Sequence, residues 1–268
     1  MGSIFRGREK ILIGVIHLRP LPGAPRWQGS LDRVIAAAVA DARAYERGGA
    51  RALIIENFGD VPFTKSSVGA ETVAAMAVAG RAVREASRLP IGFNVLRNDP
   101  RAALALCSAV GGSFIRVNVH TGAMLTDQGI IEGQACETLR YRRSLGLQAE
   151  IFADVHVKHA SPLGNQPIEI SARDTLERGL ADALIVSGSG TGLATALSDV
   201  RAVRRACPQA RLLIGSGVTV ENVASLLPLA DGFIVGSSLK AAGKVSNAVD
   251  PKRVAALVRA IERRFKGR

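Results

Sequence analysis

Short apolar segments alternate with longer amphipathic segments along the whole chain. Apolar runs bounded by turn residues are typical of buried strands, and apolar positions at helical spacing are typical of surface helices. Eight strands are predicted, at Ile11–Ile16, Ala52–Glu56, Ile91–Val95, Phe114–Val117, Ile151–Val157, Ala183–Val186, Leu212–Ile214 and Phe233–Val235. Eight helices are predicted between and after them, at Leu31–Arg47, Val68–Arg88, Pro100–Val110, Ile130–Leu145, Ile168–Arg178, Thr195–Ala206, Val220–Leu227 and Pro251–Phe265.

This order of elements predicts an α/β protein with a parallel sheet. Eight strand–helix units in 268 residues favour a (β/α)8 TIM barrel, with residues 1–268 forming a single domain. An open, doubly wound sheet is the alternative. Loops that enter strands are short, whereas long loops leave them, at His17–Ser30, Asn57–Ser67, Asn118–Gly129, Lys158–Pro167, Ser187–Ala194 and Gly236–Val249. Because barrel active sites lie at the carboxyl ends of the strands, we expect the functional site on that face.

The charge balance and the cysteines exclude several classes of protein. The chain carries 35 Lys and Arg against 23 Asp and Glu, a formal net charge of +12. These basic residues form no stripe interleaved with aromatic residues, so we expect a solvated outer surface and no nucleic-acid partner. Three scattered cysteines argue against disulfides and a thiolate zinc site. With no signal peptide or transmembrane segment visible, we expect a cytoplasmic protein. We also expect it to form a homo-oligomer.

The fifth predicted strand carries three polar residues at alternate positions. Asp154, His156 and Lys158 are separated by apolar residues, so a continuous strand would direct all three into the barrel mouth. A carboxylate, an imidazole and an amine there could serve as general base, general acid and anion anchor. Lys158 could instead form a Schiff base, but nothing in the sequence shows that its amine is desolvated, so we favour an electrostatic role. The alternative is a structural salt-bridge network.

Other polar residues converge on the same face. Glu56 ends the second strand, and Arg116 lies on the fourth, so we expect both to act with the three residues of the fifth strand. His17, Asn94, Asn118 and His159 are expected to bind substrate. Glu56, Asp154 and His156 could together hold a divalent metal ion, although no local ligand spacing requires one.

Glycine and serine follow each of the last three strands. Glycine lets backbone N–H groups approach an anion closely, and the loops after the last two strands of such barrels commonly hold phosphate. Gly215, Ser216, Gly217, Gly236 and Ser237 are therefore predicted to form a phosphate cradle, with Lys240 near. Ser187, Gly188 and Gly190 are expected to add substrate contacts. Turn geometry alone is the alternative explanation. The expected partner is a phosphorylated small molecule.

Several of these segments also carry a family resemblance. The stretches 14–23 (GVIHLRPLPG), 55–60 (IENFGD), 92–98 (GFNVLRN), 153–160 (ADVHVKHA) and 187–192 (SGSGTG) resemble the BtpA/SgcQ family. The resemblance covers nearly the whole chain and implies a TIM-like barrel. It also implies a role in photosystem I biogenesis or stability for one branch, and a place among sugar-use genes for bacterial members. No catalytic residues follow from it.

Two functions of different classes remain open from the sequence. The first is an enzyme acting on a phosphorylated sugar or nucleotide-like metabolite, of the aldolase, isomerase, epimerase or glycosidic-bond-cleaving type. The second is a non-catalytic assembly or stability factor for a larger complex. The polar barrel mouth favours the first, whereas a large exposed apolar patch would favour the second.

Overall fold

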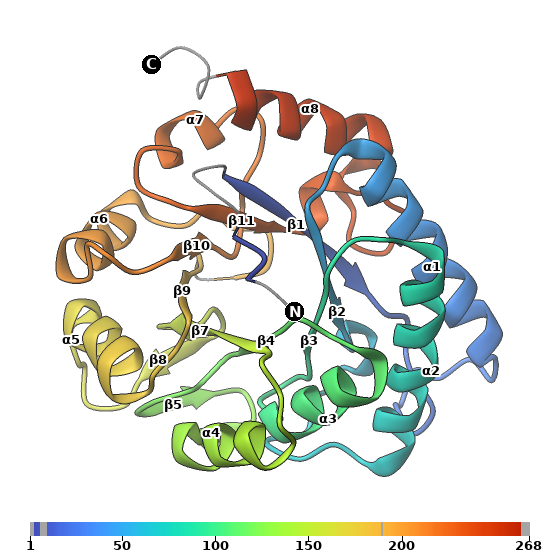
Figure 1. The fold of residues 1–268 in the computed structure, drawn as a ribbon, viewed down its shortest axis with the longest axis horizontal. Coiled ribbons are helices and arrows are strands. Elements are labelled where there is room, and N and C mark those ends of the chain that lie inside the picture. Colours follow the sequence, from blue (N-terminus) through green and yellow to red (C-terminus); the bar gives the residue numbers. More distant parts are fainter. Residues whose placement is uncertain (1–2, 6–9, 189, 264–268) are drawn as a thin grey trace.

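A computed structural model describes residues 3–5, 10–188 and 190–263. Eight parallel strands close into a barrel in the order β1-β11-β10-β9-β7-β4-β3-β2, with the helices outside it (Figure 1). The barrel strands are β1 (Ile11–His17), β2 (Ala52–Glu56), β3 (Ile91–Asn94), β4 (Phe114–Val117), β7 (Glu150–Val155), β9 (Ala183–Val186), β10 (Leu212–Ile214) and β11 (Gly232–Val235). The predicted TIM barrel is therefore confirmed, and the open sheet is excluded.

The helices form the outer layer, and a predicted capping acid is observed at the start of the third one. They are α1 (Leu31–Gly48), α2 (Ala70–Ala86), α3 (Pro100–Val110), α4 (Ala135–Ser144), α5 (Ile168–Arg173), α6 (Leu197–Ala206), α7 (Val223–Leu226) and α8 (Pro251–Arg263). The Asp99 carboxylate accepts a hydrogen bond from Ala102 N at 2.8 Å, and Pro100 occupies the first helical position. The last two residues predicted for the closing helix, 264 and 265, lie outside the described residues.

The largest differences from the predicted elements are the start of the fourth helix and the end of the fifth strand. A three-stranded antiparallel sheet of β5 (Ala123–Thr126), β6 (Gly129–Glu132) and β8 (Ala160–Pro162) stands beside the barrel. The predicted helix from Ile130 is wrong at its start, because Gly129 at φ +90° turns the chain into a hairpin and the helix begins only at Ala135. The fifth predicted strand ends at Val155 rather than Val157, which changes the site.

Side chains inside the barrel are arranged in layers, apolar below and polar above. The rings of Phe114 and Phe152 stack at 4.7 Å, and both side chains are fully buried. Gly92 makes this packing possible, since a Cβ there would lie 2.2 Å from the Phe114 ring. Two residues further along β4 and β7, the same inward face carries Arg116 and Asp154. The packed apolar layers thus support a polar layer at the carboxyl ends of the strands.

Within the described ranges, no helix has the length and apolar character needed to cross a bilayer.

Candidate active site at the barrel mouth

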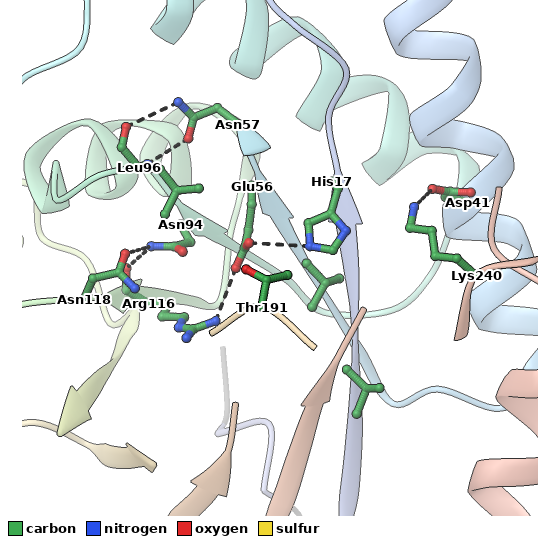
Figure 2. Close-up of polar contacts among 12 residues, drawn as sticks. His17, Asp41, Glu56, Asn57, Asn94, Leu96, Arg116, Asn118, Thr191 and Lys240 are labelled. Atoms are coloured by element: carbon green, nitrogen blue, oxygen red, sulfur yellow. Dashed lines mark hydrogen bonds and ion pairs between the residues drawn. The ribbon is translucent and has the colours of Figure 1, made fainter. Parts of the chain in front are cut away.

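Strand register brings polar residues of three neighbouring strands into one row. His17 ends β1 and pairs with Glu56 at the end of β2, and Glu56 pairs in turn with Asn94 at the end of β3. The Asn94 amide donates hydrogen bonds to the Arg116 carbonyl at 3.1 Å and to Asn118 Oδ1 at 3.0 Å. These contacts fix the orientation of the Asn94 amide and connect the row to β4 (Figure 2).

Arg116 lies at the centre of the mouth and binds two carboxylates. It donates to both Asp154 oxygens, at 2.8 and 2.9 Å, and its Nη1 lies 3.4 Å from Glu56 Oε1. Burial alone would lower the pKa of this guanidinium, but the charges and hydrogen bonds of Asp154 and Glu56 outweigh burial and raise the pKa above its ordinary value. Arg116 is therefore a permanent cation held in place by Asp154 from below and by Glu56 from the side.

Asp154 and His156 both line a cavity of about 250 Å3, but His156 lies outside the polar cluster around Arg116. Asp154 is buried and also accepts a hydrogen bond from Asn118 Nδ2 at 3.2 Å, so its oxygens are occupied by Arg116 and Asn118. His156 follows the end of β7 with φ +52°, a left-handed conformation that ends the strand alternation. Its Nε2 lies 3.0 Å from Ser171 Oγ on α5. The prediction that three alternating side chains share the barrel mouth is thus wrong for His156.

The predicted metal ligands are not assembled. The Arg116 guanidinium bridges Glu56 and Asp154 and so occupies the position that a metal ion between them would need. His156 points toward α5. Among the residues that the structure describes, no group of three or more His, Cys, Asp or Glu side chains could hold a metal ion. The residues present therefore do not fit the divalent-metal site expected from the sequence.

His17 is a neutral, buried neighbour of Glu56. Burial lowers its pKa well below the ordinary value, and the nearby Lys240, Lys158 and Arg116 charges lower it further. The 3.9 Å between His17 Nε2 and Glu56 Oε2 therefore separates a neutral ring from a carboxylate and is not an ion pair at neutral pH. Gly236 leaves room for the imidazole, because a Cβ there would lie 2.5 Å from His17 Cε1.

Lys158 is fixed by its backbone, and its amine remains unpaired. Its N–H donates to Ser187 Oγ at 3.1 Å, and its carbonyl accepts from Arg97 Nη2 at 2.6 Å. Within the described part of the chain, no carboxylate lies at salt-bridge distance from Lys158 Nζ. Burial lowers the pKa of this amine, and the Arg116 charge lowers it further. The desolvation that the sequence could not reveal is therefore present.

Two cavities meet at this cluster. The first, here called the glycine cavity, has a volume of about 300 Å3, and the second, the apolar cavity, has about 400 Å3. The residues that line both are Glu56, Arg116, Lys158 and Thr191. The glycine cavity is also lined by His17, Gly215, Ser216, Gly217, Gly236, Ser237 and Arg253. The apolar cavity is also lined by Phe58, Val61, Phe63, Asn94, Leu96, Arg97, Asn118, Asp127 and His159.

The predicted glycine cradle lines a single cavity, and its backbone is tightly packed. Gly217 has φ +63°, and a Cβ there would lie 2.3 Å from the Leu193 carbonyl oxygen. Ser216 is held by hydrogen bonds from its Oγ to Gly190 O at 3.0 Å and Leu193 O at 3.1 Å. The Ser216 hydroxyl therefore ties the loop after β9 to the loop after β10.

Some predicted contacts lie elsewhere. Of the described residues that line the two cavities, none is Ser187, Gly188 or Gly190. Two of them contact residues that line the site, because Ser187 Oγ accepts the Lys158 N–H and the Gly190 carbonyl accepts the Ser216 hydroxyl. The Lys240 backbone N–H donates to the Ser237 carbonyl at 3.2 Å, so Lys240 lies near the cradle as predicted, but its amine pairs with Asp41 at 2.7 Å (Figure 2).

His159 closes one side of the mouth. Its Nε2 accepts a hydrogen bond from the Thr191 backbone N–H at 3.1 Å and also lies 3.1 Å from Thr191 Oγ1. The pair joins the loop after β7 to the loop after β9.

Sequence reasoning missed Arg97, Thr191 and Arg253. Arg97 lies within the stretch 92–98 that carries the family resemblance, and Arg253 is the third residue of α8. The placement of Arg97 and Thr191 depends on loops whose path the hydrophobic pattern does not specify, and that of Arg253 depends on how α8 packs.

Comparison with known proteins gives the family. The BtpA family matches residues 8–263. The chain belongs to the BtpA family. It is 46% identical to the photosystem I biogenesis protein BtpA of Synechocystis sp., over 96% of this chain and 90% of the relative. It is 47% identical to an uncharacterized protein of Pyrococcus furiosus, over 94% of each chain, and 35% identical to the putative sgc region protein SgcQ of Escherichia coli, over 92% of each.

Solved structures of similar shape are distant in sequence. N-(5'-phosphoribosyl)anthranilate isomerase from Pyrococcus furiosus superposes with a TM-score of 0.57 at 13% identity, covering 94% of this chain and 99% of that one. Tryptophan synthase from M. tuberculosis gives a TM-score of 0.59 at 15% identity, covering 95% and 94%. At these identities the likeness establishes the barrel fold alone.

Proposed function

We propose that this BtpA-family barrel is an enzyme that acts on a phosphorylated small metabolite at the mouth formed by Glu56, Arg116 and Lys158. The observation that carries the proposal is the charge of the glycine cavity. Arg116, Lys158 and Arg253 line it, and Glu56 is the one carboxylate among its described lining residues. A concave site with surplus positive charge and glycine-rich loops is suited to a phosphoryl group.

The phosphoryl group is assigned to the end of the cavity away from Glu56. There the loops that carry Gly217, Gly236 and Ser237 provide backbone N–H groups, and Arg253 provides a guanidinium. Arg253 Nη1 donates to the Ser238 carbonyl at 3.1 Å, which holds the guanidinium beside the loop that follows β11. This arrangement leaves the metabolite's reacting part beside Glu56 and Lys158.

The three central residues take different roles in this proposal. Glu56 exchanges a proton with the substrate as general acid or general base. Its oxygen Oε2, near the neutral His17, is free for this role because Arg116 contacts the other oxygen, Oε1. Lys158 stabilises negative charge that develops on the substrate, because its amine is unpaired. Arg116 holds Glu56 in position. Proton exchange, stabilisation of negative charge and positioning by these three residues are compatible with lyase, isomerase, epimerase and glycosidic-bond-cleaving chemistry.

Thermal unfolding with phosphorylated and unphosphorylated probes tests the phosphate assignment. Ribose 5-phosphate is expected to raise the Tm in a concentration-dependent way, whereas ribose has little effect, because only ligands of the native state stabilise it. Arg253→Ala should reduce the shift strongly, and the control Lys252→Ala on the same exposed turn should keep it. An equal shift in wild type and Arg253→Ala would contradict the assignment.

Gly217→Ala provides a second test with a matched control. The new Cβ would press the cradle against Leu193, and Gly111→Ala has similar backbone strain at φ +77° with open space around it. Loss of the ribose 5-phosphate shift in Gly217→Ala alone supports the cradle. Loss in both, or in neither, counts against it.

A non-catalytic assembly factor is the second candidate. The small sheet favours it, because Leu125 and Ile130 are paired across β5 and β6 and are 53% and 40% exposed, next to Leu163 at 54%. In a host that depends on its own copy, the two candidates predict opposite results. If the protein is an enzyme, growth of the host should fail with Lys158→Met and continue with Leu125→Lys. If it is an assembly factor, growth should continue with Lys158→Met and fail with Leu125→Lys, which disrupts the apolar face.

A further inference from the structure

The apolar cavity has no part in the phosphate assignment, yet it opens on the same reacting residues. Its wall is formed by Phe58, Val61 and Phe63 from the loop after β2 and by Leu96 from the loop after β3. It shares Glu56, Arg116 and Lys158 with the glycine cavity. A ligand that spans both cavities would therefore place the bond between its two halves beside these residues.

The apolar wall is held in place without a ligand. Asn57 Oδ1 accepts the Leu96 N–H at 2.7 Å, which ties the loops after β2 and β3 together. Asp60 accepts hydrogen bonds from Leu21 N at 2.8 Å and from Asn57 Nδ2 at 3.2 Å. Preorganised apolar walls of this kind bind flat rings with little ordering cost.

Two buried polar atoms at this cavity have no partner in the described structure. Asn94 Oδ1 is an unused acceptor, because both contacts of the Asn94 amide are made by its nitrogen. Arg97 Nε is an unused donor, and Arg97 is 3% exposed with no carboxylate at salt-bridge distance among the described residues. Both atoms are shielded from solvent, but the residues that carry them line the cavity together with Asp127, so a ring with polar edge atoms suits this cavity better than a hydrocarbon ring.

We infer that the substrate is a phosphorylated sugar joined to a flat heterocyclic ring, with the ring in the apolar cavity. This inference rests on the proposed function for the placement of the phosphoryl group. Adenine is one such ring, because its edge carries an amino donor next to a ring-nitrogen acceptor. The linkage between sugar and ring then lies next to Glu56 and Lys158.

Calorimetric titration with adenosine 5'-monophosphate and ribose 5-phosphate tests this inference. Wild type is expected to bind the nucleotide at least tenfold more tightly than the sugar phosphate, because the nucleotide fills both cavities. Phe63→Ala and the milder Phe63→Leu should remove most of that preference while leaving ribose 5-phosphate affinity within about twofold. Leu180→Ala, an exposed apolar residue elsewhere, is the matched control and should keep the preference.

The outcomes separate this inference from the proposed function. Equal affinities for the two probes, or a preference that survives both Phe63 variants, would overturn the ring assignment while the phosphate site stands. Failure of both probes to bind, or binding indifferent to Arg253→Ala, would overturn the proposed function itself.

Discussion

Arg116 and Asp154 form a two-pronged ion pair inside the barrel, with N–O distances of 2.8 and 2.9 Å. The pair uses both oxygens of Asp154, and Glu56 supplies the second partner of the guanidinium. Among the described residues, no carboxylate lies at salt-bridge distance from the Lys158 amine. Lys158 therefore adds positive charge to the mouth that no ion pair in this part of the chain offsets.

Breaking that pair should be costly. Asp154→Asn leaves the buried guanidinium undercompensated, and removing one partner of a buried ion pair typically costs about 3–5 kcal/mol. We expect urea unfolding to show a loss of that order. The exposed Arg81–Glu85 pair is the control, since Glu85→Gln should change stability by less than about 1 kcal/mol. Equal effects of the two substitutions would contradict the anchoring role of Asp154.

Removal of the Lys158 charge should stabilise the protein. Its native pKa is lowered, so stability attributable to this group is lowest below the native pKa and rises with pH toward the unfolded value of about 10.4. At neutral pH, Lys158→Met therefore removes an unfavourable charge and should raise the Tm by a few degrees while weakening ribose 5-phosphate binding. A lower Tm together with unchanged binding would show that the buried Lys158 charge neither destabilises the protein nor binds the ligand.

His17 should contribute to acid sensitivity. Its pKa is depressed in the native state, so the unfolded chain takes up a proton that the native chain does not, and stability falls as the pH drops below about 6.5. His17→Gln should flatten the decline in unfolding free energy between pH 7.5 and pH 5. The more exposed His159→Gln should flatten it less, and the reverse order would argue against the burial of His17 as the cause.

Borohydride trapping decides between the two roles of Lys158. Its lowered pKa meets one requirement of a Schiff-base lysine. We nevertheless expect no stable adduct with ribose 5-phosphate and borohydride, because the surplus charge at the mouth is suited to holding an anion. Mass spectrometry of the digested protein would reveal an adduct on Lys158, and such an adduct would replace the electrostatic role with a covalent one.

The barrel was predictable from the sequence because its strands are short apolar runs that alternate regularly with amphipathic helical segments. Ile11–His17 and Ala52–Glu56 match their predicted bounds within a residue. The stretch 129–132 was misassigned because two adjacent isoleucines fit either a helix or a strand, and the deciding feature was the left-handed turn at Gly129.

The site was predictable only as far as strand alternation holds. Glu56, Asn94 and Arg116 lie inside ordered strands, so their convergence followed from period-two geometry. His156 lies one residue beyond the end of β7, where a positive φ redirects it, and no residue pattern indicates that change. Arg253 reaches the glycine cavity through the packing of α8, which depends on contacts distant in the chain.

A crystal structure with ribose 5-phosphate would test most directly whether the glycine cavity holds a phosphoryl group beside Glu56 and Lys158. We expect phosphoryl density within hydrogen-bonding distance of the Gly217 and Ser237 backbone and of Arg253, with the sugar directed toward Lys158. Phosphoryl density elsewhere on the barrel, with the glycine cavity empty at saturating ligand, would contradict the phosphate assignment.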